Sequence, residues 1–140
     1  MKTRAQEYAK KVFDQVSEFK RRHTVANGKT DEIKINEYGS MAHKLPVLIR
    51  TAGLAQALAF VAASGSKKPP HRQLLEDLAK TVSQPSAEVL LEASRNEEVD
   101  EYIRLTRESL AALLWFKRFA QSVLDVDASD EPSGDRQQAA

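Results

Sequence analysis

The residues from Tyr38 to Phe60 are the least polar stretch of this chain of 140 residues, and they constrain its fold most strongly. Pro46 suits the first turn of a helix, because proline lacks an N–H and its φ angle is already helical. We therefore expect a helix from Pro46 to about Ser64 that is apolar on nearly every side and buried in the core. Gly53 within this helix costs about 1 kcal/mol relative to alanine, which predicts a close helix crossing there. In the alternative interpretation a second apolar face contacts a partner protein, and that face holds Val47, Leu54, Leu58 and Val61.

A further helix is predicted near the N-terminus. Thr3 and Gln6 have the spacing of a capping box, and the helix that they begin should run to about Arg22. Its polar side is strongly basic. Its apolar stripe, which we expect to face the core, consists of Ala5, Tyr8, Ala9, Val12, Phe13, Val16 and Phe19.

The loop after this helix covers residues 23 to 30 and contains Asn27-Gly28, a pair that is typical of turns. Its last residues, Gly28-Lys29-Thr30, resemble the end of a P-loop. The first glycine of that motif and the strand before it are both missing, so nucleotide binding through a P-loop is excluded. A second helix is predicted from about Asp31 to Lys44, because Pro46 disfavours the helical conformation at the residue before it.

Three more helices are predicted after the apolar stretch. The first runs from about Pro70 to Val82, the second is short and capped by Ser86, and the third runs from an Asn96 cap to about Leu124. The basic loop before them, with Lys67, Lys68 and Arg72 in or next to it, either touches nucleic acid or is simply solvated. The core side of the last helix is predicted to hold Val99, Tyr102, Ile103, Thr106, Leu110, Leu113, Leu114 and Leu124.

Aromatic residues in the last helix also occupy its other faces. Trp115, Phe116 and Phe119 spread away from the predicted core side, with Lys117 and Arg118 among them. Exposed aromatic and arginine side chains are typical of a protein contact or of a surface on which bases stack. Alternatively, other helices of the bundle bury these rings.

These elements predict an all-α fold, a compact bundle of five or six helices with a long C-terminal helix. Residues 1–124 should form a single helical domain, because a chain of this length builds one core. Residues 125–140 are acidic, small and polar, and we expect them to be a disordered tail.

The charges divide along the chain. Residues 1–72 hold 14 Lys and Arg against 6 Asp and Glu, which gives +8, whereas residues 73–140 hold 7 against 14, which gives −7. This asymmetry favours an anionic partner for the first half. The alternative is that the two halves pack together and their charges interleave.

Composition and spacing argue against catalysis. The chain has no cysteine, which excludes disulfides, thiolate metal sites and thiol nucleophiles. His23, His43 and His71 lie in separate segments without metal-ligand spacing, and no pair of carboxylates stands out as an acid and a base. We therefore expect a protein that is not an enzyme and has no metal or other cofactor. The absence of a long apolar run and of a signal peptide predicts a cytoplasmic protein without membrane contact.

Three parts of the sequence resemble the small all-helical subunit of the Cmr complex, the type III-B CRISPR effector that targets RNA through a guide RNA. The main part reads Tyr38-Gly39-Ser40, Lys44-Leu45-Pro46, Ile49, Gly53-Leu54 and Gln56-Ala57-Leu58-Ala59-Phe60. The first helix adds Arg4, Gln6 and Ala9. The last helix adds Trp115, Lys117, Arg118, Phe119 and Ala120.

This resemblance implies a non-catalytic subunit that serves antiviral defence. Several copies would stack head to tail beside RAMP-type subunits that carry the guide RNA, and would help hold the duplex of guide RNA and target RNA. On this basis the candidate RNA contacts are Arg4, Lys10, Lys11, Arg21, Lys44, Arg50, Lys117 and Arg118. The candidate protein contacts are Val47, Leu54, Val61, Trp115, Phe116 and Phe119. Arg50 is the strongest single candidate, because it lies on the helical wheel among apolar residues.

Two other functions remain open at this point. One is a pure scaffold, in which the apolar faces contact protein and the basic side matches acidic protein surfaces. The other is a regulator that binds DNA through a helix-turn-helix, which the basic first half and the short helices suggest. No pair of helices joined by a tight glycine turn presents a recognition helix, so the regulator ranks below the scaffold.

Overall fold

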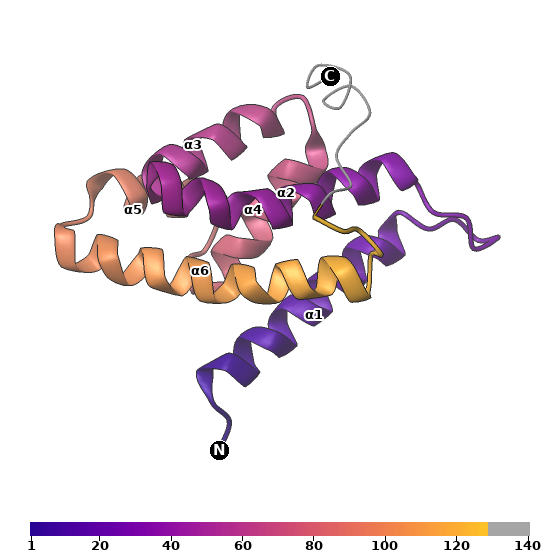
Figure 1. Cartoon of the computed structure of the whole chain (residues 1–140), viewed down its shortest axis with the longest axis horizontal. Coiled ribbons are helices and arrows are strands. Elements are labelled where there is room, and N and C mark those ends of the chain that lie inside the picture. Colours follow the sequence, from indigo (N-terminus) through magenta and orange to yellow (C-terminus); the bar gives the residue numbers. More distant parts are fainter. Residues whose placement is uncertain (129–140) are drawn as a thin grey trace.

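The structure is a computed structural model that describes residues 1–128. Within this range the chain forms six α-helices, which confirms the predicted all-α fold with a long C-terminal helix (Figure 1). They are α1 (Arg4–Arg22), α2 (Glu32–Ala52), α3 (Leu54–Gly65), α4 (Pro69–Thr81), α5 (Ala87–Asn96) and α6 (Val99–Ser122). The turn between α5 and α6 lies at one end of the long axis, and the loop between α1 and α2 lies at the opposite end (Figure 1).

The first helix begins where the sequence predicts. The backbone N–H of Gln6 donates to the Thr3 hydroxyl at 3.1 Å, and the Gln6 side chain accepts from the Thr3 N–H at 2.8 Å, which completes a capping box. The buried face of α1 consists of Tyr8, Val12, Val16 and Phe19. Phe13 was expected on this face, but it is 47% exposed. It follows Val12 directly, so it lies about 100° around the helix from the buried stripe.

The predicted boundary at Pro46 is wrong. Helix α2 passes through Pro46 and continues to Ala52, although the missing proline N–H leaves the Ala42 carbonyl without its usual helical donor. Leu45 and Ile49 on either side are buried, and this burial offsets the cost of the proline, which is about 3 kcal/mol in a helix interior.

The chain breaks at Gly53 instead. Gly53 has a φ angle of +90°, a conformation that glycine adopts without strain and other residues rarely adopt. Its N–H bonds the carbonyl of Ile49 at 2.9 Å and so closes α2, and the next residue begins α3. The expected helix from Pro46 to Ser64 is therefore two helices, α2 and α3, which contact each other.

Helix α4 lies at the centre of the packing, because it contacts each of the other five helices. The largest fully buried side chains come from several helices and meet in one core; they include Tyr38, Leu45, Leu54, Leu58, Leu74, Leu78, Leu90, Leu113 and Phe116. Helix α6 packs against both α1 and α2 along this core.

The orientation of α6 differs from the prediction. Val99, Ile103 and Leu114 were expected in the core, but they are 71%, 44% and 45% exposed. The buried positions of α6 are Leu105, Ser109, Ala112, Leu113, Phe116 and Ala120. Small residues at three of these positions let α1 and α2 approach the helix closely, and hydropathy does not reveal that preference. The helix also begins later than expected, with Glu98 as its cap, because Asn96 is the last residue of α5.

The packed part of the chain extends beyond α6. Val126 was assigned to the predicted tail, but it is only 3% exposed, and its carbonyl lies 2.8 Å from the Nε2 atom of His43. Gly39 makes room for it on α2, since a Cβ atom at that position would lie 2.7 Å from Val126. The rest of the predicted disordered tail, residues 129–140, lies outside the described residues.

Candidate nucleic-acid interface

The eight basic residues predicted to contact RNA are all exposed. Three of them are partly neutralised by carboxylates: Arg4 lies 3.5 Å from Glu108, Lys10 lies 3.2 Å from Asp14, and Arg21 bonds Glu18. An existing ion pair leaves less net charge for a phosphate. These three are therefore weaker candidates than the sequence pattern suggests.

Of these three ion pairs, the one between Arg21 and Glu18 at the end of α1 is the most firmly held. Hydrogen bonds from Arg21 and then Arg22 lower the pKa of the Glu18 carboxyl to about 2. Glu18 consequently stays ionised at neutral pH and offsets part of the basic cluster at this helix end. Because Glu18 is exposed, these ion pairs add little to stability.

The other five candidates make no ion pair within residues 1–128; they are Lys11, Lys44, Arg50, Lys117 and Arg118. Arg50 lies in the last turn of α2, where the helix dipole also favours a cation. The exposed Val47 lies one turn before it, but Leu54 and Val61, which the helical wheel placed beside Arg50, belong to α3 and are buried.

Three aromatic rings form a strip across α1 and α6, which we call the aromatic strip. The rings of Phe13 and Phe119 meet edge to face with centroids 5.4 Å apart, and Trp115 stacks beside Phe119 at 5.8 Å. The Arg118 guanidinium lies 5.0 Å from the Trp115 ring centre, in a cation–π contact. Phe13 is about half exposed, and Trp115 and Phe119 are half-buried. The strip thus combines rings on which bases can stack with a cation that can meet phosphate.

Three of the predicted protein contacts are not available to a partner. Leu54, Val61 and Phe116 are each 0% exposed, so their side chains belong to the core of this chain. The amphipathic pattern was misread at these positions because α2 and α3 are separate helices and because α6 is turned relative to the prediction. Val47, by contrast, is 54% exposed and remains accessible.

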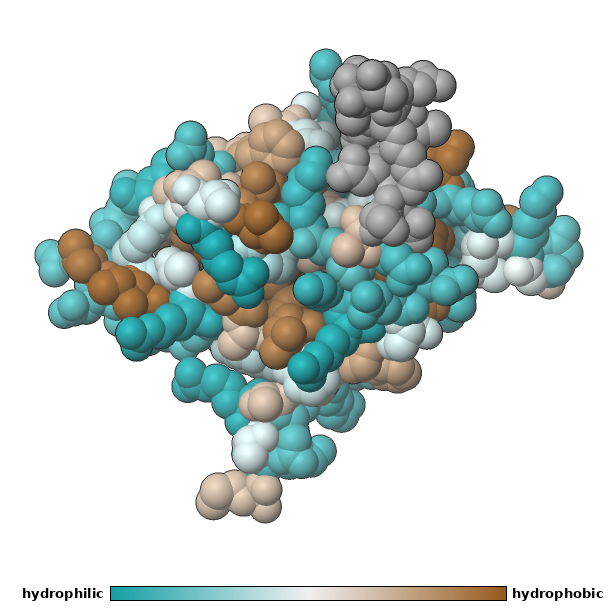
Figure 2. All heavy atoms as spheres, viewed as in Figure 1, coloured by the Kyte–Doolittle hydropathy of each residue, from teal (hydrophilic) through white to brown (hydrophobic). Residues whose placement is uncertain are grey.

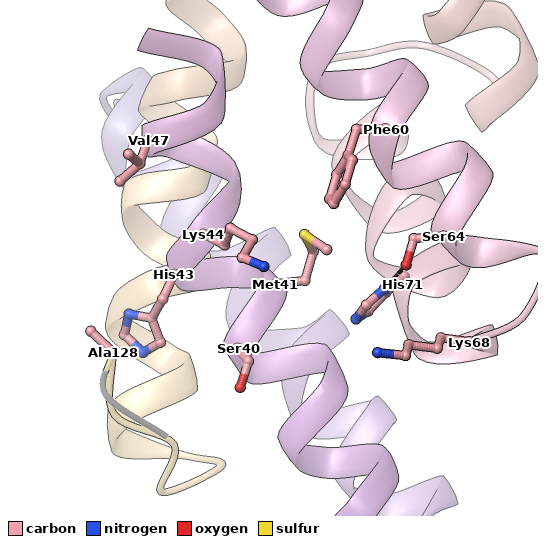
Figure 3. Close-up of a pocket in the computed structure, with 10 residues that line it drawn as sticks. All are labelled: Ser40, Met41, His43, Lys44, Val47, Phe60, Ser64, Lys68, His71 and Ala128. Carbon is pink, nitrogen blue, oxygen red and sulfur yellow. Dashed lines mark hydrogen bonds between the residues drawn. The ribbon is translucent and has the colours of Figure 1, made fainter. Parts of the chain in front are cut away.

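A second group of cations surrounds a cavity of about 420 Å³ between α2, α3 and the start of α4. Figure 3 shows Lys44 from α2 and Lys68 and His71 from the other side pointing toward the same space. Of the eight candidate RNA contacts only Lys44 lines it. The sequence pattern singled out Lys68 as one of three basic residues that either touch nucleic acid or are solvated. It did not predict the cavity, because the fold brings the lining residues together from distant segments.

Residues 1–128 contain no group of three or more His, Asp or Glu side chains that could hold a metal ion. Over the same range, no helix has the length and apolar character needed to cross a bilayer. The described residues form an all-α module whose surface carries exposed cations and the aromatic strip.

The comparisons identify the family of this module. The family model described as CRISPR-associated protein (Cas_Cmr5) matches residues 4–123. The CRISPR system Cmr subunit Cmr5 of Thermus thermophilus is 46% identical over 125 residues, which cover 89% of this chain and 99% of that protein. A crystal structure of a CRISPR-associated Cmr5 family protein from Thermus thermophilus matches with a TM-score of 0.75 and 46% identity, over 88% of this chain and 98% of that one.

The chain therefore belongs to the Cmr5 family of CRISPR-associated proteins. This confirms the family resemblance of the Tyr38 to Phe60 stretch.

Proposed function

We propose that this chain is a non-catalytic small subunit of a Cmr-type CRISPR ribonucleoprotein complex and helps hold the duplex of guide RNA and target RNA in antiviral defence. Family membership supports the place in a Cmr complex. The aromatic strip is the observation that favours direct RNA contact. Its Arg118 and the neighbouring Lys117 make no ion pair within the described residues, so both charges are available to phosphates.

The exposed apolar side chains support protein contacts in the same complex. Val99, Ile103 and Leu114 on α6 and Val47 on α2 are all at least 44% exposed. Figure 2 shows apolar surface in brown between polar side chains on the face along which α6 runs. We propose that this face contacts neighbouring Cmr subunits, and that the exposed Val47 on α2 is a separate protein contact.

The distribution of charge supports head-to-tail stacking of copies. Acidic residues gather at the turn between α5 and α6; they are Glu97, Glu98, Asp100 and Glu101. The opposite end of the long axis carries the basic end of α1, where Lys20, Arg21 and Arg22 outnumber the Glu18 carboxylate that pairs with both arginines. Opposite charges at the two ends favour contact between the acidic end of one copy and the basic end of the next.

The test replaces both free cations of the strip, Lys117→Ala with Arg118→Ala, in an assembled Cmr complex. Each phosphate contact that is lost should lower the slope of log affinity against log salt by roughly 0.7 to 0.9, so the double variant should bind the guide–target duplex more weakly and with less salt dependence. Arg95→Ala on α5 is the matched control, because Arg95 is also exposed and makes no described ion pair.

Equal RNA affinity and equal salt slope in the wild type, the double variant and the control would remove the aromatic strip from the RNA surface. If the complex also assembles normally in that case, the result favours the pure protein scaffold over RNA contact through the aromatic strip.

A further inference from the structure

The cavity between α2, α3 and α4 has the lining of a site for an anion. Among residues 1–128, ten line it; they include two lysines, two serines, His71 and His43, the last of which is turned toward Ala128 (Figure 3), and no aspartate or glutamate. Lys44 and Lys68 make no ion pair within residues 1–128. Two unneutralised ammonium groups that point into one cavity repel each other, and an anion between them removes that repulsion (Figure 3).

The polar groups at one end of the cavity are held in place by the fold. The Ser64 hydroxyl and the Nδ1 atom of His71 lie 2.6 Å apart, which fixes the His71 ring between α3 and α4. His71 is only 6% exposed. Lys68 is the N-cap residue of α4, so the positive end of the helix dipole adds to the charge of its side chain.

The other end of the cavity is apolar and contains an aromatic ring. Phe60 is 48% exposed, Met41 on α2 lies across from it, and Val47 also lines the cavity (Figure 3). The Lys44 ammonium lies 5.9 Å from the centre of the Phe60 ring, so the ring and the cationic end adjoin. An aromatic ring next to cations suits a ligand that carries a base and a phosphate.

The size of the cavity agrees with such a ligand. Its volume of about 420 Å³ is far more than an inorganic anion fills, and it lies within the range of roughly 300 to 1,000 Å³ that is usual for small-molecule sites.

We propose that this cavity binds a nucleoside phosphate, with the phosphate between Lys44 and Lys68 and the base against Phe60. The ligand is either a free mononucleotide or one nucleotide of an RNA strand. The site shares no residue with the aromatic strip, so it stands independently of the RNA surface proposed there.

The experiment titrates the full chain with adenosine 5′-monophosphate by isothermal calorimetry. Lys44→Gln and Lys68→Gln should each weaken binding by about tenfold, the effect of losing one charge-assisted phosphate contact. Lys67→Gln is the matched control, because Lys67 is exposed and does not line the cavity, and it should change the affinity by less than about twofold.

Two further titrations test the base contact of the ligand and the separation of this site from the aromatic strip. Phe60→Leu should weaken the binding of adenosine 5′-monophosphate, but not the weaker binding of inorganic phosphate. Lys117→Ala with Arg118→Ala should leave nucleotide binding unchanged, which separates this site from the aromatic strip. Circular dichroism melting of each variant verifies that it is folded.

The source of the ligand is tested with a 5′-phosphorylated tetraribonucleotide. Tighter binding than the mononucleotide, with competition between the two, supports a nucleotide of an RNA strand; binding of the mononucleotide alone supports a free nucleotide. No binding of either ligand at millimolar concentration would overturn the proposal, as would an equal loss in the Lys67→Gln control and the two cavity variants.

Discussion

The phenol of Tyr38 donates a hydrogen bond of 2.7 Å to the Oδ2 atom of Asp77 inside the core. The Gln73 side chain donates to Oδ1 of the same carboxylate at 2.9 Å, and the Gln15 side chain donates to the Asp77 backbone carbonyl at 3.0 Å. Thr81 completes the network with a hydrogen bond to Gln15 at 2.9 Å. These bonds tie α1, α2 and α4 together through a polar cluster that hydropathy patterns do not predict.

Removal of the Tyr38 hydroxyl should destabilise the fold. Tyr38→Phe leaves one oxygen of a buried carboxylate without its donor, and we expect a loss of about 1 to 3 kcal/mol in the free energy of unfolding. Urea unfolding measures this loss. Tyr8→Phe is the control, because the buried Tyr8 has no hydrogen bond from its phenol among the described contacts, and it should cost less. A Tyr38→Phe variant as stable as the wild type would contradict the role of this bond.

The cost of Tyr38→Phe should depend on pH. Burial raises the pKa of the Asp77 carboxyl above its ordinary value of 3.8, although hydrogen bonds from Tyr38 and Gln73 oppose the rise. Between the unfolded and folded pKa values the folded state holds more protons, so the free energy of unfolding rises as the pH falls through that window. Loss of the Tyr38 donor moves the folded pKa further up and enlarges this effect.

The difference in stability between the wild type and Tyr38→Phe should therefore be largest near pH 7 and shrink as the pH falls toward about 4. Urea unfolding at a series of pH values measures it. In an Asp77→Asn background the difference should no longer vary with pH. A cost that grows in acid would show that the Tyr38 hydroxyl raises the pKa of the Asp77 carboxyl instead of lowering it.

Gly39 and Val126 should show strong coupling. A Cβ atom at position 39 would lie between 2.7 and 2.9 Å from three atoms of the Val126 side chain, so Gly39→Ala should cost about 1 to 3 kcal/mol. In a Val126→Gly background the clash is gone, and the better helix propensity of alanine should make the same substitution stabilising by up to about 1 kcal/mol. A double-mutant cycle by urea unfolding measures the coupling. Additive effects would mean that Val126 does not pack on α2.

The helix break at Gly53 can be tested with two matched substitutions. Gly53 and Gly28 have φ angles of +90° and +82°, so alanine is strained at both. Nothing lies within 4 Å of a Cβ atom at position 28, whereas one at position 53 would lie 3.3 Å from the Tyr102 hydroxyl, which accepts a hydrogen bond from the Ala55 N–H. Gly53→Ala should therefore lower the melting temperature more than Gly28→Ala. The reverse order would argue against this account of the break.

The sequence predicted the helix caps and the turn that depend on nearby residues alone. Thr3, Ser86 and Asn27-Gly28 act through their own hydroxyls or backbone preferences, and their caps and turn are found where expected. The boundary at Pro46 failed because tertiary burial of α2 outweighs the local preference of proline. The same burial moves the break to Gly53, where the conformation requires glycine.

The candidate site was only partly predictable for a related reason. Trp115, Phe119 and Arg118 were recognised from their residue types, and the structure places them in one strip. Phe13 was assigned to the core, and Phe116 to a surface, because a wheel drawn from hydropathy does not show which small residues face the neighbouring helices. The cavity depends on residues from α2, α3 and α4, and no periodicity in one segment reveals it.

Contact between this chain and RNA can be measured most directly by ultraviolet cross-linking of a guide–target duplex in an assembled Cmr complex, followed by mass spectrometry of the cross-linked peptides. We predict cross-links to the aromatic strip, at Phe13, Trp115 or Phe119, because a base that stacks on one of these rings lies in direct contact with it. A complex that assembles and binds RNA normally, with no cross-link to this chain, would contradict the proposed role in holding the duplex.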